Sequence, residues 1–328
     1  MFDQLFESFQ HIRVAVVGDV MLDTYWMGYA DRLSPEAPVP VVALKSKEYR
    51  LGGAANVALN LLSLGAQVDM YAVMGNDEDG QQLALMMQEN NIGTAGVLQV
   101  PNRITTNKIR VVSRSQHLLR IDHEVATDLE EPLEAQFIAQ TMAAFAAKPP
   151  QVVIFEDYNK GVLTKNVIEA LITYCRQHDI LTTVDPKRKN FFAFKGVDVF
   201  KPNLKEVKEA LNIIEKVGTL ESLSRIHYLL QQQLQHHISF ITLSELGVFV
   251  QQEEDALLLP AFIRNIADVS GAGDTVIAVA SLVYAATKNR QLMAQVANLA
   301  GGIVCEQVGT VAISKTKLLA ECNALIAP

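Results

Sequence analysis

Short runs of apolar, β-branched residues alternate along this chain with longer runs of helical periodicity. The first of these runs predict a strand at 12–17, a helix at 54–65 that ends at a glycine, and a strand at 67–73. The alternation resumes after residue 150, with predicted strands at 151–155, 181–184, 197–200 and 238–243 and predicted helices at 165–178 and 205–211. This order predicts an α/β fold with a mainly parallel sheet and helices on both faces. Ligands in such folds bind beyond the carboxyl ends of the strands.

Two segments, about 24–51 and 104–122, do not follow this order. The first carries three prolines around a short apolar run, and the second alternates in polarity like a two-stranded ribbon. We interpret both as strands of a small β lid over the ligand site, and ordinary edge strands of the main sheet are the alternative. An exposed lid face needs a cover, so the pattern favours a homodimer that forms through the lid.

The size and charge of the chain limit its class. A chain of 328 residues with 49% hydrophobic content can bury a large core, and we expect a single domain over 1–328 with the lid as its appendage. The net charge of −8 argues against a nucleic-acid partner and favours a small molecule. Cys175, Cys305 and Cys322 lack the spacing of a zinc motif, and we expect reduced thiols. The chain start lacks a signal-peptide pattern, and the run 276–286 is about half of a membrane span, so we expect a cytoplasmic protein without a membrane partner.

A glycine-rich turn precedes a lone carboxylate late in the chain. Gly271, Ala272 and Gly273 stand directly before Asp274 and the apolar run 276–286. Backbone N–H groups at a helix start have no intrahelical partner and attract negative charge, so small residues there let a phosphate approach the amides. An Asp at the same place can take a proton from a hydroxyl while the amides hold the charge of a transferring phosphoryl group. A simple N-cap role for Asp274 is the alternative.

Polar residues also follow the early predicted strands. Asp19 and Asp23 come just after the strand at 12–17, where charge-assisted hydrogen bonds could hold a hydroxyl-rich ligand, although capping would also explain each of them. Gly52 and Gly53 open a helix, and Asn56 in its first turn offers both a donor and an acceptor. Sugar hydroxyls suit that mixture.

Two later strand ends carry candidate nucleotide contacts. Asn203 and Glu206 are three residues apart, so a helix that starts there places both on one face, where they could order Mg2+-bound water beside phosphates. A capping box is the alternative, and the two roles can coexist. Ser244 and Gly247 end another strand in a pattern compatible with the phosphate or ribose of a nucleotide.

In their order along the chain, these motifs resemble the PfkB, or ribokinase-like, family of carbohydrate kinases, and the resemblance covers essentially the whole chain. It rests on the segments 52–56, 201–206 and 271–275. The resemblance implies a ribokinase-like three-layer α/β/α fold and an ATP-dependent kinase with an alcohol group as acceptor. It also implies Asp274 as the general base and the backbone of 271–273 as the anion hole.

By the same resemblance, Asp23, Gly53 and Asn56 match sugar-binding positions, and Asn203 with Glu206 organises the phosphates and, through water, Mg2+. We also predict sugar contacts for Asp19 and Gly52, and ATP contacts for Asn203, Leu204, Lys205, Glu206, Ser244, Gly247 and Asn298. A monovalent cation such as K+, near Asp268 and Ser270, is common in the wider family. Position 270 is Ser where relatives commonly carry Thr, a change that keeps the hydroxyl.

Three further segments, 18–26, 34–42 and 106–114, are similar to the heptose 7-phosphate kinases of this family. That similarity implies phosphorylation of the C1 hydroxyl of D-glycero-β-D-manno-heptose 7-phosphate, on the way to ADP-heptose and lipopolysaccharide. Many relatives carry a fused adenylyltransferase, whereas this chain stops at Pro328, so we expect a stand-alone kinase. A kinase for another sugar, sugar phosphate or nucleoside and a non-catalytic sugar-binding protein are the alternatives. No Gly-x-Gly-x-x-Gly follows the first strand, which disfavours an NAD-dependent oxidoreductase.

A sugar phosphate needs cationic donors, and Arg can bind a phosphate with two hydrogen bonds. Four basic residues of the lid ribbon share one parity and are expected on one side, either toward the site or in solvent: Lys108, Arg110, Arg114 and Arg120. We predict that Lys108 and Arg110 contact the substrate, as do Asp157 and Lys160 after the strand at 151–155. Glu156 and Asn159 stand at positions that vary among relatives, which bears on the finer substrate contacts.

Overall fold

The main sheet of this molecule has nine strands in the order β13-β12-β11-β10-β9-β8-β1-β4-β5. The structure is a computed structural model that describes residues 2–114 and 116–326. Seven neighbouring strands of this sheet run parallel: β11, β10, β9, β8, β1, β4 and β5. The strands β12 and β13 complete one edge in antiparallel pairing. The bounds are β1 Arg13–Gly18, β4 Gln67–Gly75, β5 Gly93–Val100, β8 Val152–Glu156, β9 Leu181–Asp185, β10 Val199–Phe200, β11 Ile238–Thr242, β12 Val248–Gln252 and β13 Asp255–Leu259.

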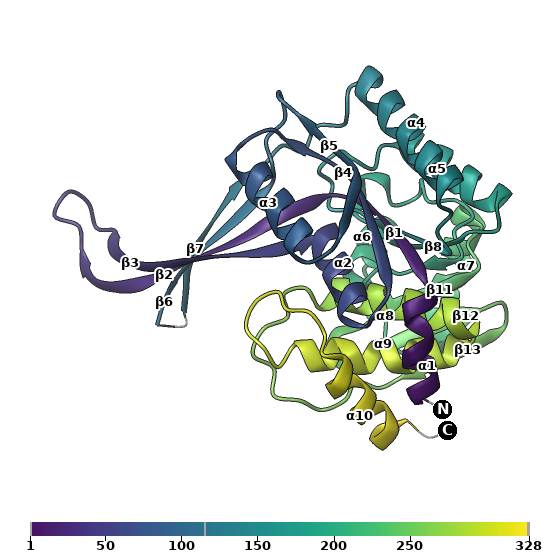
Figure 1. The fold of residues 1–328 in the computed structure, drawn as a ribbon. Coiled ribbons are helices and arrows are strands. Elements are labelled where there is room, and N and C mark those ends of the chain that lie inside the picture. The colour runs from purple at the N-terminus through teal and green to yellow at the C-terminus, as the bar shows by residue number, and fades with distance from the viewer. Residues whose placement is uncertain (1, 115, 327–328) are drawn as a thin grey trace.

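The sheet separates two hydrophobic cores, because successive side chains of a strand point to opposite faces. In β1, Val14 and Val16 belong to one core and Ala15 and Val17 belong to the other, and all four are buried. The helices on the first side are α1 Phe2–Ser8, α2 Ala54–Ser63, α3 Glu78–Glu89, α8 Ala272–Thr287, α9 Arg290–Val304 and α10 Lys315–Leu325. Those on the second side are α4 Glu131–Ala147, α5 Lys165–Gln177, α6 Leu204–Ala210 and α7 Leu220–Leu234 (Figure 1).

The predicted α/β class and its mainly parallel sheet are confirmed. Each strand and helix predicted for the α/β alternation is present, with boundaries within two residues of those expected. The apolar run 276–286 belongs to the longer helix α8, which begins inside the glycine turn. The carboxyl ends of β1, β8, β9, β10 and β11 therefore meet at one edge, where the motif residues follow them.

A second, four-stranded sheet projects from the body, as Figure 1 shows. Its strands are β2 Val20–Leu33, β3 Pro40–Gly53, β6 Asn107–Ser113 and β7 Gln116–His123, in the order β3-β2-β6-β7. This sheet is the predicted lid, and its strands are not edge strands of the main sheet. Pro40 begins β3, an edge strand, where a missing N–H interrupts no internal ladder. Only Asp19 separates β2 from β1, and β3 leads directly into α2.

The lid carries large apolar side chains that face solvent. Their exposed fractions range from 42% to 65% in Ile121, Tyr29, Leu119, Leu44, Val39 and Leu33. Apolar side chains gathered on one small sheet are typical of a surface that another protein covers.

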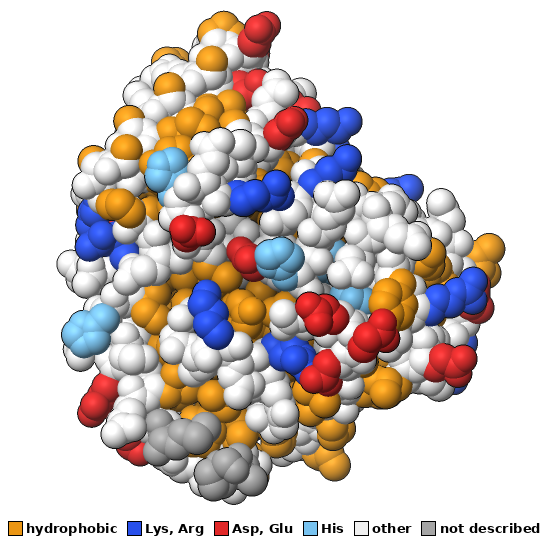
Figure 2. Space-filling model, turned by 90° about the vertical axis from the view of Figure 1, so that its right-hand side faces the viewer, with side chains coloured by type: hydrophobic (Ala, Val, Ile, Leu, Met, Phe, Trp, Pro, Cys, Tyr) orange, Lys and Arg blue, Asp and Glu red, His pale blue; other side chains and the backbone are white. Residues whose placement is uncertain are grey.

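The face opposite the lid has a different character. Figure 2 shows acidic and basic side chains interspersed there, with apolar side chains between them. Cys175, Cys305 and Cys322 are buried and carry free thiols. Among residues 2–114 and 116–326, the helices do not combine the length and the apolar character needed to cross a bilayer.

Candidate active site

The glycine turn shapes the start of helix α8. Gly271 is the N-cap residue and has a φ of 75°, in the left-handed region that glycine adopts without strain. A Cβ atom at this position would lie 2.7 Å from Nδ2 of Asn56, so a side chain would also displace that amide. The turn therefore brings bare backbone and the first turn of α8 next to helix α2.

Asp274 lies in that first turn and is only 2% exposed. Its carboxylate accepts hydrogen bonds from Asn56 Nδ2 and from the Tyr158 hydroxyl, each at 2.7 Å and each on a different oxygen. Burial raises the pKa of Asp274 to about 6, although these two hydrogen bonds act to lower it. The N-cap alternative is wrong, because the helix cap is Gly271 and the carboxylate is bound by other elements. A buried carboxylate with this pKa suits general-base catalysis near neutral pH.

Asn56 is itself held by a network that sequence reasoning missed. Asn60, one turn further along α2, donates from Nδ2 to the Asn56 carbonyl oxygen at 2.9 Å. The Oδ1 atom of Asn60 accepts from the Thr275 hydroxyl at 3.0 Å and from the Ile313 N–H at 2.9 Å. Asn60 thus joins α2 to α8. A polar residue inside this mainly apolar helix was the sequence signal that could have identified Asn60 as part of a buried hydrogen-bond network.

A chain of ion pairs lies at the carboxyl ends of β9 and β10. Asp185 binds Lys201 Nζ at 2.7 Å and Lys187 Nζ at 3.0 Å, and Lys187 also binds Glu206 at 2.9 Å. Burial disfavours the charged form of Asp185, but the two lysines outweigh it and lower its pKa. Burial also opposes the charge of Lys187, yet Asp185 and Glu206 raise its pKa. Lys187 therefore stays cationic near Asp274.

Glu156 is paired in register with Asp185 on the neighbouring strand, so their side chains lie on the same face of the sheet. Both carboxyl oxygens of Glu156 are buried and lack a hydrogen-bond partner within the described chain. Burial, with Asp185 and Asp274 nearby, raises the pKa of Glu156 well above its ordinary value. Burial in this place therefore favours the protonated form of the Glu156 side chain.

A cavity of about 1100 Å³ opens beside Asp274. Four of the predicted nucleotide residues line this cavity: Asn203, Leu204, Lys205 and Ser244. Three lysines and two glycines of the turn also line it: Lys187, Lys201, Lys208, Gly271 and Gly273. Gly247 and Asn298 are not among its lining residues. Gly247 forms the turn before β12, and Asn298 on α9 donates to the Pro260 carbonyl oxygen at 2.8 Å.

Asn203 and Glu206 form the capping box of α6. The Glu206 N–H donates to Asn203 Oδ1 at 2.9 Å, and the Asn203 N–H donates to Glu206 Oε2 at 2.8 Å. The capping alternative is therefore present, and it leaves both residues at the cavity wall or beside it. Asp185, Asn203 and Glu206 offer the oxygen atoms that Mg2+ prefers, so this wall fits a magnesium nucleotide that keeps some of its water.

Asp268 and Ser270 adjoin the glycine turn. One oxygen of Asp268 accepts from the Ser270 N–H and hydroxyl, at 3.0 and 2.9 Å, and the other accepts from the Gly309 N–H at 2.8 Å. Burial opposes ionisation, but these donors lower the pKa of Asp268. The position predicted for a monovalent cation therefore holds a carboxylate whose hydrogen bonds favour the anionic form.

Asp19 and Asp157 hold the loop after β8. The Asp19 carboxylate accepts from the N–H groups of Tyr158 and Lys160 at 2.9 Å and of Val162 at 3.2 Å. Asp157 accepts from the Asn159 N–H at 2.7 Å, and burial, followed by the charge of Asp19, raises its pKa to about 7. Neither side chain lines the large cavity. Their visible contacts position this loop.

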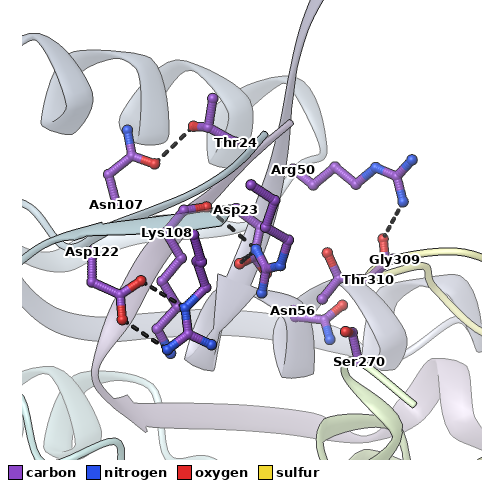
Figure 3. Close-up of polar contacts among 12 residues, drawn as sticks. Asp23, Thr24, Arg50, Asn56, Asn107, Lys108, Asp122, Ser270, Gly309 and Thr310 are labelled. Atoms are coloured by element: carbon purple, nitrogen blue, oxygen red, sulfur yellow. Dashed lines mark hydrogen bonds and ion pairs between the residues drawn. The ribbon is translucent and has the colours of Figure 1, made fainter. Parts of the chain in front are cut away.

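The predicted sugar side lies where the lid meets the body (Figure 3). Asp23 pairs with Arg110 at 2.5 Å, and it lies close to Gly52, where a Cβ atom would be 2.7 Å from a carboxylate oxygen. Lys108 reaches toward the body, with Nζ 5.0 Å from the centre of the Tyr158 ring. Lys160 instead pairs with Glu124 at 2.7 Å.

The four lid cations do not share one environment. Arg110 and Arg120 are opposite each other in the β6–β7 register, and Arg120 binds Asp122 through two nitrogens at 2.8 and 2.9 Å. Arg114, expected on the same side, instead follows the end of β6 with a φ of 47° and pairs with Asp31 at 2.6 Å. The strand parity ends at Ser113, so it could not place Arg114.

Arg50 on the lid strand β3 makes a contact between the lid and the body that sequence reasoning missed. It donates to the Val308 carbonyl oxygen at 2.8 Å and to that of Thr310 at 3.4 Å, in the loop beside the glycine turn (Figure 3). Tyr158, Asp185 and Lys201 were also missed, although each stands in or just after a strand end, which is where ligands bind in this architecture.

Known proteins share this sequence pattern and this fold. Residues 11–317 match the pfkB family carbohydrate kinase description. The chain is 37% identical over 323 residues to the Bifunctional protein HldE of Geotalea uraniireducens (strain Rf4), and the match covers 97% of this chain but 64% of that relative. The chain thus spans less than two thirds of the length of this curated relative.

Two solved structures share the fold. Phosphofructokinase-2 from Escherichia coli in complex with potassium has a TM-score of 0.77 at 17% identity and covers 95% of this chain and 99% of its own. Arabidopsis thaliana ribokinase complexed with ribose and ATP has a TM-score of 0.72 at 16% identity, and the match covers 94% of this chain and 98% of that one. The predicted ribokinase-like fold is confirmed.

Proposed function

We propose that this chain, which belongs to the pfkB family of carbohydrate kinases, uses Asp274 as the general base that activates a sugar hydroxyl toward ATP. The observation that carries this proposal is the Asp274 carboxylate, buried at the start of α8 beside the cavity and with its pKa raised to about 6. A base of this strength is ionised near neutral pH and can still accept a proton in the transition state.

The chain's own groups account for the charge changes of the transfer. Asp274 accepts the proton of the hydroxyl whose oxygen forms a bond to the γ-phosphorus of ATP, while the bond from that phosphorus to the β–γ bridging oxygen breaks and ADP keeps the electron pair. The amides of 271–273 face developing negative charge, since α8 begins there. Lys187 and Lys201 supply fixed positive charge on the same side.

We assign the nucleotide to the 1100 Å³ cavity. Asn203 and Glu206 would hold Mg2+ through water, and Asp268 with Ser270 would adjoin a monovalent cation. Bound Mg2+ supplies charge neutralisation at the phosphates. Gly247 and Asn298 would act on the nucleotide only by shaping the elements around this cavity.

The acceptor that we propose is the C1 hydroxyl of D-glycero-β-D-manno-heptose 7-phosphate, with the 1,7-bisphosphate of the ADP-heptose route as product. Support comes from the similarity to relatives named HldE and from the cations of the lid. Lys108 lies near Tyr158 of the body, and Arg110 pairs with Asp23 of the neighbouring lid strand, so a sugar phosphate placed here could receive charged donors.

A coupled assay of ADP release across a sugar panel tests this assignment. The panel contains heptose 7-phosphate, fructose, fructose phosphates, ribose and adenosine. We expect turnover with the heptose phosphate, and preference for another acceptor would replace the substrate assignment while leaving the kinase chemistry intact. Asp274→Asn should fold and bind ATP but lose about 10²-fold to 10⁴-fold in kcat, the range for loss of a general base. Near-normal turnover of that variant would refute the role of Asp274.

We also propose that a second copy of this chain covers the lid. The apolar side chains of the lid, including Leu33 at 65% and Val39 at 51% exposure, support a self-associating surface. Sedimentation of the wild type and of Leu33→Glu would test it. A monomeric wild type would refute the proposed dimer.

A further inference from the structure

Tyr158 makes a contact that the roles assigned above do not include. Its hydroxyl donates to one oxygen of Asp274 at 2.7 Å, and Asn56 donates to the other oxygen at the same distance. The two donors come from different elements, the loop after β8 and helix α2. A carboxylate that is bound at both oxygens from separate elements cannot rotate freely about its side-chain bonds.

Tyr158 is itself fixed before it reaches Asp274. Its N–H donates to Asp19 at 2.9 Å, and two further N–H groups of the same loop, those of Lys160 and Val162, bind the same carboxylate. Asp19 is 1% exposed and immediately follows β1, an inner strand that lies between β8 and β4. The backbone of Tyr158 is therefore tied to the buried end of an inner strand of the sheet.

The ring of Tyr158 is held as well. Lys108 Nζ from the lid lies 5.0 Å from the ring centre, and Lys187 Nζ from the nucleotide cavity lies 5.4 Å from it. A cation within about 6 Å of an aromatic ring is attracted to it. The phenol ring thus lies near one cation of the sugar side and one of the nucleotide side, and its hydroxyl donates to the base.

We propose that Tyr158 is a positioning residue for phosphoryl transfer, whose hydroxyl fixes the Asp274 carboxylate in the orientation that accepts the sugar proton. The residue acts through Asp274 and not on the sugar, so its loss should slow the chemical step without weakening substrate binding. Small errors in the orientation of a reacting group can cost about 10²-fold in rate. This inference rests on the proposed function, in which Asp274 is the base.

Tyr158→Phe removes the hydroxyl and keeps the ring between the two lysines. Tyr228→Phe is a matched control, because the Tyr228 hydroxyl also donates to a carboxylate, Glu254, at 2.8 Å, but on the surface and outside the site. Steady-state kinetics with the best acceptor of the sugar panel should give a kcat at least about tenfold lower for Tyr158→Phe, with both KM values within about twofold of wild type. Tyr228→Phe should match wild type, and all three proteins should melt at similar temperatures.

A kcat of Tyr158→Phe within twofold of wild type would overturn the inference, and so would a rise in KM with kcat unchanged. A kcat loss that Tyr228→Phe reproduces would also overturn it, since the loss would then not depend on the site. The proposed function has a separate criterion. If the wild type phosphorylates no member of the panel, or if Asp274→Asn retains full turnover, the general-base assignment fails, whatever Tyr158→Phe does.

Discussion

The Asn56 amide should set the pH at which this enzyme loses activity in acid. Asn56 is 1% exposed and donates to the base Asp274, whose ionised form it stabilises. Asn56→Leu is close in volume and cannot donate. A hydrogen bond to a charged group contributes about 1.5 to 3 kcal/mol, and one pKa unit corresponds to about 1.4 kcal/mol. The pKa of Asp274 should therefore rise by about one to two units in the variant, from about 6 to about 7 or 8.

The sign of the effect follows from the role of the base. Asp274 must be ionised to accept a proton, so kcat should fall as the pH drops through its pKa, and the acidic limb should lie at higher pH in Asn56→Leu. At pH 6 about half of the wild-type base is ionised, against about a tenth or less in the variant. Other ionisable groups near this carboxylate are the same in both proteins, namely Glu156, Tyr158, Asp185 and Lys187.

The assay is direct chromatography of ADP at saturating sugar and ATP from pH 5 to pH 9. Its readout is the position of the acidic limb and not the plateau, because the substitution can also change kcat at every pH. Ser63→Ala is the control, since its hydroxyl donates to the Asn60 carbonyl oxygen on the same helix without touching Asp274. An acidic limb of Asn56→Leu at the wild-type pH would refute the reasoning.

Two further predictions concern backbone strain and acid stability. Gly271→Ala places a Cβ atom at a φ of 75° and 2.7 Å from Asn56 Nδ2, so kcat should fall by at least about tenfold while the fold persists; a circular-dichroism spectrum like wild type with unchanged kcat would contradict it. Burial lowers the pKa of His227 to about 4 and that of His236 to about 3, so both are neutral in the folded protein and gain protons on unfolding as the pH falls below about 6.5. Between pH 6 and pH 5 these two histidines should lower the free energy of unfolding, measured with urea, by about 2 kcal/mol relative to the variant His227→Gln/His236→Gln, while the raised pKa values of Asp157 and Asp274 act in the opposite direction in both proteins.

The fold was predictable because its signal is repeated. Inner parallel strands are buried on both faces, so residues 152–155 of β8 are all apolar, and a helix such as α5 shows one apolar stripe. The lid was predictable because its segment 104–122 alternates in polarity, unlike the apolar strands of the main sheet. What the sequence could not give is the length of β2 and β3, because their polar outer halves look like loop.

The candidate site was predictable where one motif is local and less so where the site is assembled from distant segments. Asp274 and the glycine turn are contiguous, and Asn56 lies close to its own glycines. Tyr158 reaches Asp274 across 116 positions of sequence, and Asn60 reaches Thr275 across 215, so no spacing rule could pair them. Asp19 was expected to bind sugar, yet its carboxylate accepts three backbone N–H groups, a use of Asp that has no sequence signature.

The way the lid joins the body has a mechanical consequence. One residue, Asp19, connects β1 to β2, and β3 passes into α2 without a loop, so the lid has no flexible linker at either of these ends. Its pairing irregularities lie further out, between Met27 and Gly28 and between Tyr29 and Arg32. A swing of the whole lid as a hinged flap would drag Asp19 and the start of α2 with it, and would disturb Asn56. The outer lid can instead bend at these irregularities while its base stays still, which lets the tip adapt to a ligand or a partner without moving the catalytic carboxylate.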